Sequence, residues 1–195
     1  MRKIYRFGYM AACLALFSFA GEAAAYDSAI RAGVSSHSLK YQDQSTSFTG
    51  TSGGAHVGYA GRIVDYFSFE VRLGSAGKSS GGGLTLQPGL FLSLLAQPTL
   101  PVGNVGEIYG LIGATSLALG RTAGNGTQEI VGRLGFSYGV GGDVRINEHM
   151  AVGGEYLVYA RNLDFGPQNG SKNWTGVTRA QVSFSGAGIN FKYLF

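Results

Sequence analysis

Hydrophobic and polar residues alternate along most of the chain, and the alternation is most regular at residues 130–146. Every second residue of this segment is apolar or glycine, and the residues between them are mostly polar, charged or small. Successive side chains of a β-strand point to opposite faces of the sheet, so a period of two predicts a strand with one apolar and one polar face. The chain is therefore predicted to consist of strands that separate two different environments.

The same alternation predicts eight strands in all. They cover approximately residues 30–35, 56–63, 67–73, 84–94, 107–119, 130–146, 150–161 and 181–195. Two of these segments are irregular. Pro88 interrupts the apolar row of Leu84, Leu86, Leu90, Leu92 and Leu94. The segment 107–119 is apolar on both faces, so the orientation of this strand stays open.

The connectors between the predicted strands alternate in length and polarity. Long polar connectors are predicted at 39–53, 75–83, 121–128 and 162–178. Shorter connectors are predicted near 64–65 and 147–148, and one that contains proline at 97–104. Short turns on one side and longer loops on the other are typical of membrane-spanning barrels with an even number of strands.

The first 25 residues have the pattern of a cleaved secretory signal. Three basic residues precede an apolar run of roughly 14 residues, and Ala23 and Ala25 form an Ala-x-Ala cleavage site. A membrane-spanning helix would need about 20 apolar residues. Cleavage before Cys13, as in a lipoprotein, is the alternative, and it would leave an apolar tail. We therefore predict a signal peptide at 1–25 and a mature barrel domain at 26–195.

The composition indicates which environment faces the apolar side of the strands. Charged residues make up 13% of the chain, about half of the ~25% that is usual in soluble domains. Alternation alone would also allow a soluble, lipocalin-like barrel with its apolar face inside. The signal, the low charge and the unequal connectors favour lipid outside. A sheet survives in hydrocarbon only if it closes, so the predicted fold is an all-β, eight-stranded antiparallel up-and-down transmembrane β-barrel.

Aromatic residues near the predicted strand ends are expected to form the girdles of such a barrel at the two membrane interfaces. They are Tyr59, Tyr66, Phe67, Tyr109, Tyr138, Tyr156, Phe191 and Phe195.

The polar face of the predicted strands carries charges of both signs. We expect a polar network in the lumen made by Arg31, Arg62, Glu70, Arg72, Arg133, Asp143, Arg145, Glu155, Arg161 and Lys192, with His56 beside them. An eight-stranded barrel is just wide enough to be filled by side chains. Buried charges must be paired, so we expect arginine–carboxylate pairs and a plugged lumen, not an open pore.

Two segments resemble a known family. Residues 142–156 resemble the strand–turn–strand signature of the small outer-membrane β-barrel family that includes the OmpA membrane domain, OmpX and the opacity proteins, and residues 188–195 resemble its terminal strand. The resemblance implies location in the bacterial outer membrane and assembly by the outer-membrane assembly machinery. It also implies that Phe191, Tyr193 and Phe195 act as the assembly signal. It implies no reaction, because members of the family act variously as adhesins or envelope tethers.

Some eight-stranded barrels are lipid A deacylases or palmitoyl transferases, and such catalysis would require a set of serine, histidine and an acidic residue. His37 and Ser38 lie at the predicted outer end of the first strand, but Leu39 and Lys40 follow, where the deacylases have the pattern His-x-Ser-Asn. His37, His56 and His149 are scattered and give no metal site. We expect no catalytic residues and no cofactor, with a lipid A-modifying enzyme or a narrow channel as the alternative functions.

The connector 162–178 is the best candidate for ligand contact. Phe165, Lys172, Trp174 and Arg179 offer an aromatic and basic surface that suits lipopolysaccharide or a host ligand. The alternative places Trp174 in the outer aromatic girdle. The expected partners are outer-membrane lipid, lipopolysaccharide, the assembly machinery and a host or surface ligand. Removal of the signal leaves a net charge of only +2, so nucleic acid is not expected.

Overall fold

The computed structural model describes residues 28–103, 105–122, 126, 128–167 and 174–195, all of whose regular elements are strands. The predicted signal peptide and Lys172 lie outside these residues. The strands are β1 (Ser28–Asp43), β2 (Ser47–Val64), β3 (Phe67–Ala76), β4 (Ser79–Gly81), β5 (Leu84–Val102), β6 (Gly106–Thr122), β7 (Gln128–Arg145), β8 (Met150–Asp164) and β9 (Ala180–Leu194). No helix that is long and apolar enough to cross a membrane occurs among the described residues.

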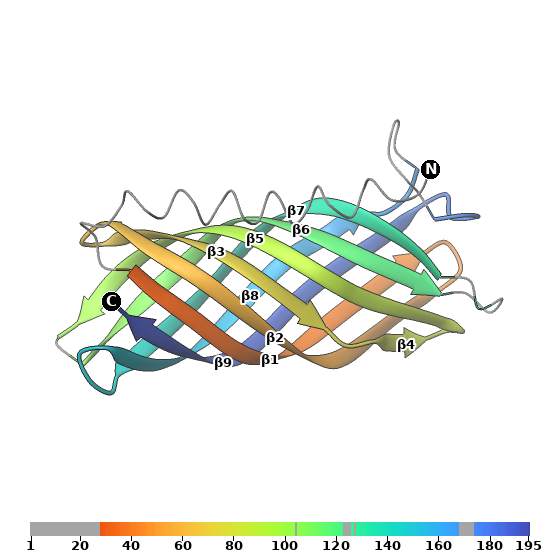
Figure 1. Cartoon of the computed structure of the whole chain (residues 1–195). Coiled ribbons are helices and arrows are strands. Elements are labelled where there is room, and N and C mark those ends of the chain that lie inside the picture. Colours follow the sequence, from red (N-terminus) through yellow and green to blue (C-terminus); the bar gives the residue numbers. More distant parts are fainter. Residues whose placement is uncertain (1–27, 104, 123–125, 127, 168–173) are drawn as a thin grey trace, which may run out of the picture.

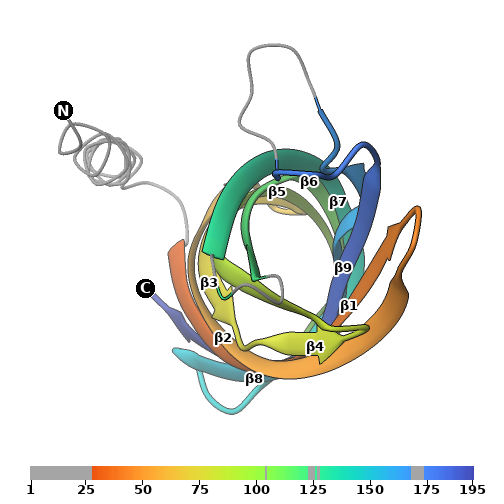
Figure 2. The same cartoon turned by 90° about the vertical axis from the view of Figure 1, so that its right-hand side faces the viewer.

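The strands form one closed antiparallel ring (Figures 1 and 2). The order is β3-β2-β1-β9-β8-β7-β6-β5-β4, and β3 also pairs with β5. Both β3 and β4 pair with β5, at Ser75↔Leu90 and Ser79↔Leu86 respectively. They therefore share one place in the wall, and the predicted eight-stranded, up-and-down barrel is confirmed with its third strand broken in two.

The ring closes between the strands that are farthest apart in the sequence. β1 pairs with β9 from Ala29↔Leu194 to Asp43↔Ala180. The backbones of Ser28 and Phe195 exchange two further hydrogen bonds of 2.9 Å each. We call the part of the barrel at this end the inner half, because the short turns of outer-membrane barrels face the periplasm, and the opposite part the outer half.

Two of the predicted outer loops are largely strand. The predicted loop 39–53 lies within β1 and β2, which pair as far as Gln42↔Ser47. The Asp43 carboxylate closes the turn by accepting hydrogen bonds from the backbone N–H groups of Ser45 and Thr46 at 2.7 and 2.6 Å. Most of 75–83 likewise belongs to β3 and β4. These segments look like loops in the sequence because their outward side chains are polar, although their inward ones, such as Tyr41, are buried.

Register shifts change the faces of two strands. β5 has one between Pro88 and Phe91, so Leu86 is fully buried whereas Leu90 is 64% exposed. The single apolar row predicted from Leu84 to Leu94 is therefore wrong, and Pro88 marks where it changes face. β8 has two shifts, between Val158 and Leu163.

The orientation of the strand predicted at 107–119, which is β6, is settled by its buried side chains. Tyr109, Leu111, Leu117 and Leu119 point into the barrel and are buried, while Ile112 is exposed on the outside. The placement of Tyr109 in an interfacial girdle is therefore wrong. A tyrosine suits either position, because its ring is apolar and its hydroxyl can bind a buried polar partner.

Candidate functional site: the barrel interior

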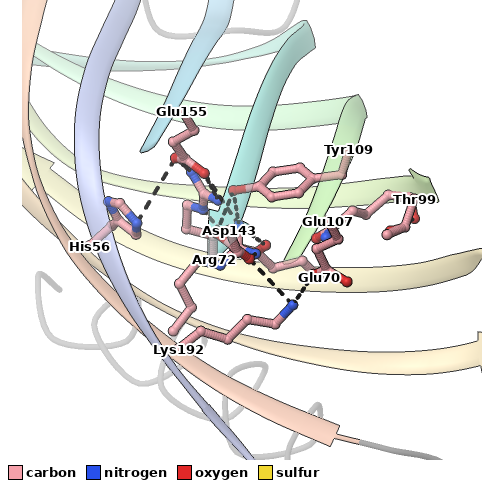
Figure 3. A network of polar contacts seen from close by, with 11 residues as sticks. His56, Glu70, Arg72, Thr99, Glu107, Tyr109, Asp143, Glu155 and Lys192 are labelled. Carbon is pink, nitrogen blue, oxygen red and sulfur yellow. Dashed lines mark hydrogen bonds and ion pairs between the residues drawn. The ribbon is translucent and has the colours of Figure 1, made fainter. Parts of the chain in front are cut away.

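The interior of the inner half holds buried ion pairs centred on Arg31 of β1. Figure 3 shows Glu70, Arg72, Asp143 and Glu155 of this network. The Arg31 guanidinium nitrogens lie 3.1 Å from Asp143 Oδ2, 3.2 Å from Glu70 Oε2 and 3.3 Å from Glu155 Oε2. The Tyr109 ring lies 4.8 Å from Arg31 Cζ, and the Tyr109 hydroxyl accepts a 3.1 Å hydrogen bond from Arg31. One cation thus connects side chains from four other strands across the lumen.

Arg72 of β3 joins two of the same carboxylates. Its Nε donates to Glu70 Oε1 at 2.7 Å, and its Nη2 donates to Glu155 Oε2 at 2.9 Å, while Nη1 pairs with Glu155 Oε1. His56 Nε2 lies 4.0 Å from that last oxygen. Arg31, Glu70 and Arg72 are fully buried. Burial is tolerable only while every charge keeps its partners, so each member of this network depends on the others.

The network continues towards the inner mouth of the barrel. Lys192 of β9 pairs with Glu107 of β6, and its Nζ lies 3.4 Å from Asp143 Oδ2. Arg62 lines the same hollow as Glu107 and Lys192. Side chains of β1, β2, β3, β6, β7, β8 and β9 therefore meet in one layer of alternating charge.

Two of the arginines that were predicted in this network, Arg161 and Arg133, lie elsewhere. A third, Arg145, is exposed at the inner mouth, where β7 ends, and lines one hollow with Glu107, Asp143 and Lys192. Arg161 is exposed on the outside of β8, because the register shifts of this strand turn it away from the lumen. Arg133 is buried, but its Nε donates to Asp164 O at 3.1 Å and its Nη2 to Gly166 O at 3.2 Å. It thereby holds the segment after β8 against β7.

A row of hydroxyl groups lies between the charges and the outer half. The hydroxyls of Ser93 and Thr115 are 2.7 Å apart, and those of Thr115 and Ser137 are 2.6 Å apart. Ser137 donates onward to Tyr159 O at 2.8 Å. All three hydroxyl residues are buried, and each hydroxyl has a partner, so this row crosses β5, β6 and β7 without leaving a polar group unpaired.

Aromatic side chains fill the next layer. The His37 ring stacks on Phe184 at 4.9 Å between ring centroids and lies 5.9 Å from Phe91 and 5.7 Å from Tyr159. His37 is buried, and its Nε2 lies 2.8 Å from Ser35 Oγ. The predicted position of His37 at the outer end of the first strand is therefore wrong, because β1 continues to Asp43. Among the described residues no carboxylate hydrogen-bonds to it, so the triad that the enzyme alternative required is not assembled here.

The outermost layer is built from the segment after β8. Trp174 is only 2% exposed and stacks on Phe165 at 4.9 Å between ring centroids, and the Tyr41 ring lies 6.3 Å from it. Both predictions for Trp174 are therefore wrong, because it lies neither on a ligand-facing surface nor in the outer girdle. Phe165 is also buried, whereas Arg179 is exposed. An aromatic residue in a loop has no periodic neighbours to indicate its direction.

The terminal strand presents the three residues of the expected assembly signal on its outer face. Phe191, Tyr193 and Phe195 are 42%, 46% and 58% exposed, and the intervening Lys192 points inward. No group of three His, Cys, Asp or Glu that could hold a metal ion occurs among the described residues.

Sequence reasoning did not identify the hydroxyl and aromatic layers. A signal was present, because Tyr159 shares the predicted inward row of Glu155 on β8, and Phe184 lies on the same alternating row as Lys192 on β9. Large aromatic side chains on the polar side of a strand indicate that the interior is filled at that level.

The family model for the outer membrane protein beta-barrel domain matches residues 10–195. Among solved structures, the chain is similar to Ail, the attachment invasion locus protein of Yersinia pestis, in complex with the heparin analogue sucrose octasulfate. The TM-score is 0.58 at 14% identity, over 87% of this chain and 99% of that chain. Neisserial surface protein A has a TM-score of 0.58 at 13% identity, over 86% and 99%. OprG from Pseudomonas aeruginosa has 0.52 at 18% identity, over 87% and 96%. No curated protein sequence matches the chain.

Proposed function

Because the chain belongs to the outer membrane protein β-barrel domain family and lies in the bacterial outer membrane, we propose that it is a non-enzymatic barrel with a plugged lumen. In this proposal it contributes to envelope integrity and displays surfaces at its outer end for adhesion or ligand contact. We further propose that residues 1–25 are a cleaved export signal and that Phe191, Tyr193 and Phe195 direct assembly.

The single observation that carries the plugged lumen is the succession of layers in the interior. Ion pairs around Arg31, the hydroxyl row around Thr115, the aromatic layer around His37 and the stack of Trp174 on Phe165 follow one another along the barrel. The first three layers each contain buried side chains from several strands, and the fourth comes from the segment after β8. An ion that entered the lumen would have to displace paired charges and then pass apolar rings, and both steps are costly.

Conductance tests this part of the proposal. The refolded mature protein in a planar lipid bilayer should give no discrete current steps under conditions in which an open porin conducts. Trp174→Ala removes only the outermost layer, so it should stay silent as well. Reproducible steps from the wild-type protein would overturn the plugged lumen and favour the narrow channel.

The proposal that the barrel is not an enzyme is tested by analysing lipid A. Mass spectra of lipid A from cells with and without the protein should show the same acyl chains. A shift by one acyl chain that His37→Ala abolishes would instead establish the enzyme alternative. Because His37 is buried among aromatic rings, we expect no such shift.

The role of the outer surfaces in adhesion is tested by replacing two surface segments. The tip of the β1–β2 hairpin, 44–46, and the segment 165–179 are replaced separately by short Gly–Ser linkers. Adhesion of bacteria to host cells should fall for at least one replacement, while the amount of folded barrel in the outer membrane stays equal. Adhesion that is unchanged in both variants, and in cells that lack the protein, would contradict the displayed-surface role.

A further inference from the structure

The outer wall of β1, β8 and β9 carries a row of basic and hydroxyl side chains on the outer side of its apolar surface. Lys40 of β1 is opposite Ser183 of β9. On the other side of Ser183, β8 pairs Ala160 with Phe184 and Leu163 with Val182, so Arg161 and Asn162 together face Ser183. Neighbouring strands lie about 4.8 Å apart, which places the Cα atoms of Lys40 and Arg161 roughly 10 Å from each other. Both side chains are exposed.

The backbone of β8 is distorted in a way that holds Arg161 on this surface. Tyr159 and Ala160 are both buried, so the alternation is reset just before Arg161. Without that shift, Arg161 would share the inward row of Leu157 and Tyr159 and enter the aromatic layer. Asn162 has a φ of 50°, which is uncommon for a residue other than glycine. Its N–H donates to Ser183 Oγ at 2.9 Å, and the Ser183 hydroxyl donates back to Asn162 Oδ1 at 3.2 Å.

The row lies at the upper edge of the lipid-facing surface. On β1 the exposed apolar residues end at Val34, and Ser36, Ser38 and Lys40 follow on the same face. Val34 is opposite Ile189 of β9, which is exposed as well. Strands of such barrels rise about 2.5 Å per residue along the axis once their tilt is included. Lys40 therefore stands roughly 15 Å beyond Val34, and its side chain is long enough to reach back towards the membrane.

Charge at this edge is not neutralised within the described part of the chain. No ion pair of Lys40 or Arg161 occurs among these residues. Asp164, the acidic residue at the outer end of the same strand, accepts a 2.7 Å hydrogen bond from the Gly166 N–H. A molecule that contacts both this row and the apolar surface below it must combine anionic groups with acyl chains.

We propose that Arg161 and Lys40, with Ser183 between them, bind the phosphate groups of an outer-leaflet glycolipid of the lipopolysaccharide type. The acyl chains of this lipid lie against the exposed side chains of Val34, Ile189 and Tyr156. Arginine binds phosphate through two parallel N–H donors, and lysine adds a mobile charge. The site lies on the outer wall, so it is independent of the plugged lumen and of the adhesive surfaces.

Binding of fluorescent lipid A that carries both phosphates tests the site. With the refolded mature protein in detergent micelles, the double variant Arg161→Gln/Lys40→Gln should bind at least fivefold more weakly than wild type. The matched control, Lys78→Gln/Arg145→Gln, removes the same charge from exposed positions elsewhere and should bind within twofold of wild type. The shift of the folded barrel on unheated gels verifies that each variant has folded.

Two further binding experiments identify the ligand. In the first, lipid A without phosphates should bind the wild-type protein weakly. Its binding should be as weak as that of bisphosphorylated lipid A to the Arg161/Lys40 variant. In the second, millimolar inorganic phosphate should compete poorly with lipid A because it has no acyl chains. Equal weakening in both double variants would show a general charge effect and overturn the proposal. Equal binding of the dephosphorylated lipid would also overturn it. Effective competition by inorganic phosphate would reassign the row to free anions.

Discussion

On β1 and β2 the inner and outer halves of the barrel place polar and apolar side chains on opposite faces. In the inner half the outside is apolar, as at Val34, which is 58% exposed, and the inside holds the charges around Arg31. In the outer half the outside carries Ser38 and Lys40, and the inside holds apolar residues such as Leu39. The period of two is the same in both halves. Alternation therefore identifies a strand, whereas the surrounding solvent decides which face is polar.

The two halves are also held together by different forces. The outer half resembles a soluble barrel, in which apolar side chains leave water when they pack inside. The inner half has hydrocarbon outside, so its interior is stabilised by mutual satisfaction of charges and hydrogen bonds. Substitutions at matched positions can test this contrast.

The largest effect is expected from removing the central cation of the inner half. Arg31→Met leaves Glu70, Asp143 and Glu155 without their shared partner, and it should lower the free energy of unfolding by about 3–5 kcal/mol. Urea unfolding in lipid vesicles measures the loss. Arg145→Met is the control, because Arg145 is exposed at the mouth, and it should cost less than about 0.5 kcal/mol. Equal losses for the two variants would show that the ion pairs do not stabilise the barrel.

The lipid-facing surface should respond to charge according to depth. Val140 lies opposite Tyr156 and Gly110, within the apolar surface of the inner half. Val140→Arg should destabilise by about 2–4 kcal/mol, as for arginine near the bilayer midplane, and Leu134→Arg by only about 0–1 kcal/mol. Leu134 is 70% exposed, but it lies opposite Ser116 and closer to the outer half.

The same vesicle unfolding assay ranks the two arginine variants. The order would be reversed if the membrane surrounded the outer half, so this pair locates the boundary between the halves.

The junction between the halves should show a smaller effect. Thr115→Val keeps the shape of the side chain but removes the hydroxyl that lies between Ser93 and Ser137. Ser137 keeps its bond to Tyr159 O, whereas Ser93 loses its partner, so the expected loss is about 1–2 kcal/mol. A double variant that also carries Ser93→Ala should regain part of it, as measured by urea unfolding. No recovery would mean that the row contributes through packing alone.

The smallest effect is expected on the outer face of the outer half. Ser38→Leu places an apolar side chain in the polar zone between the exposed apolar residue Val34 and Lys40, and it should change the free energy of unfolding by no more than about 0.5 kcal/mol. A stabilisation above 1 kcal/mol, measured in vesicles, would indicate that lipid extends to Ser38.

How well the sequence predicts this protein differs between the two halves for a physical reason. In the inner half, Glu70 and Arg72 stand between exposed apolar residues, so both the strand and its inward face could be recognised. In the outer half, serine and threonine on the outside resemble a loop, and the buried Tyr41 between them appears isolated. The β1–β2 hairpin was therefore predicted far too short.

Other misplacements follow from contacts between distant residues. Arg161 and Leu86 face the opposite way from their predicted rows because of register shifts, which depend on how whole strands pair. Trp174 enters the barrel because Phe165 and Tyr41 provide a surface for its ring. Neither kind of information is contained in the local pattern.

The pairing of β1 with β9 has a consequence for biogenesis. The strand made first has to wait for the strand made last before its outer edge gains a hydrogen-bonding neighbour. A sheet that has formed from neighbouring strands but has not closed therefore exposes two unpaired edges, one on β1 and one on β9, and such edges can pair with other chains and aggregate. How long these edges stay exposed depends on the speed of ring closure.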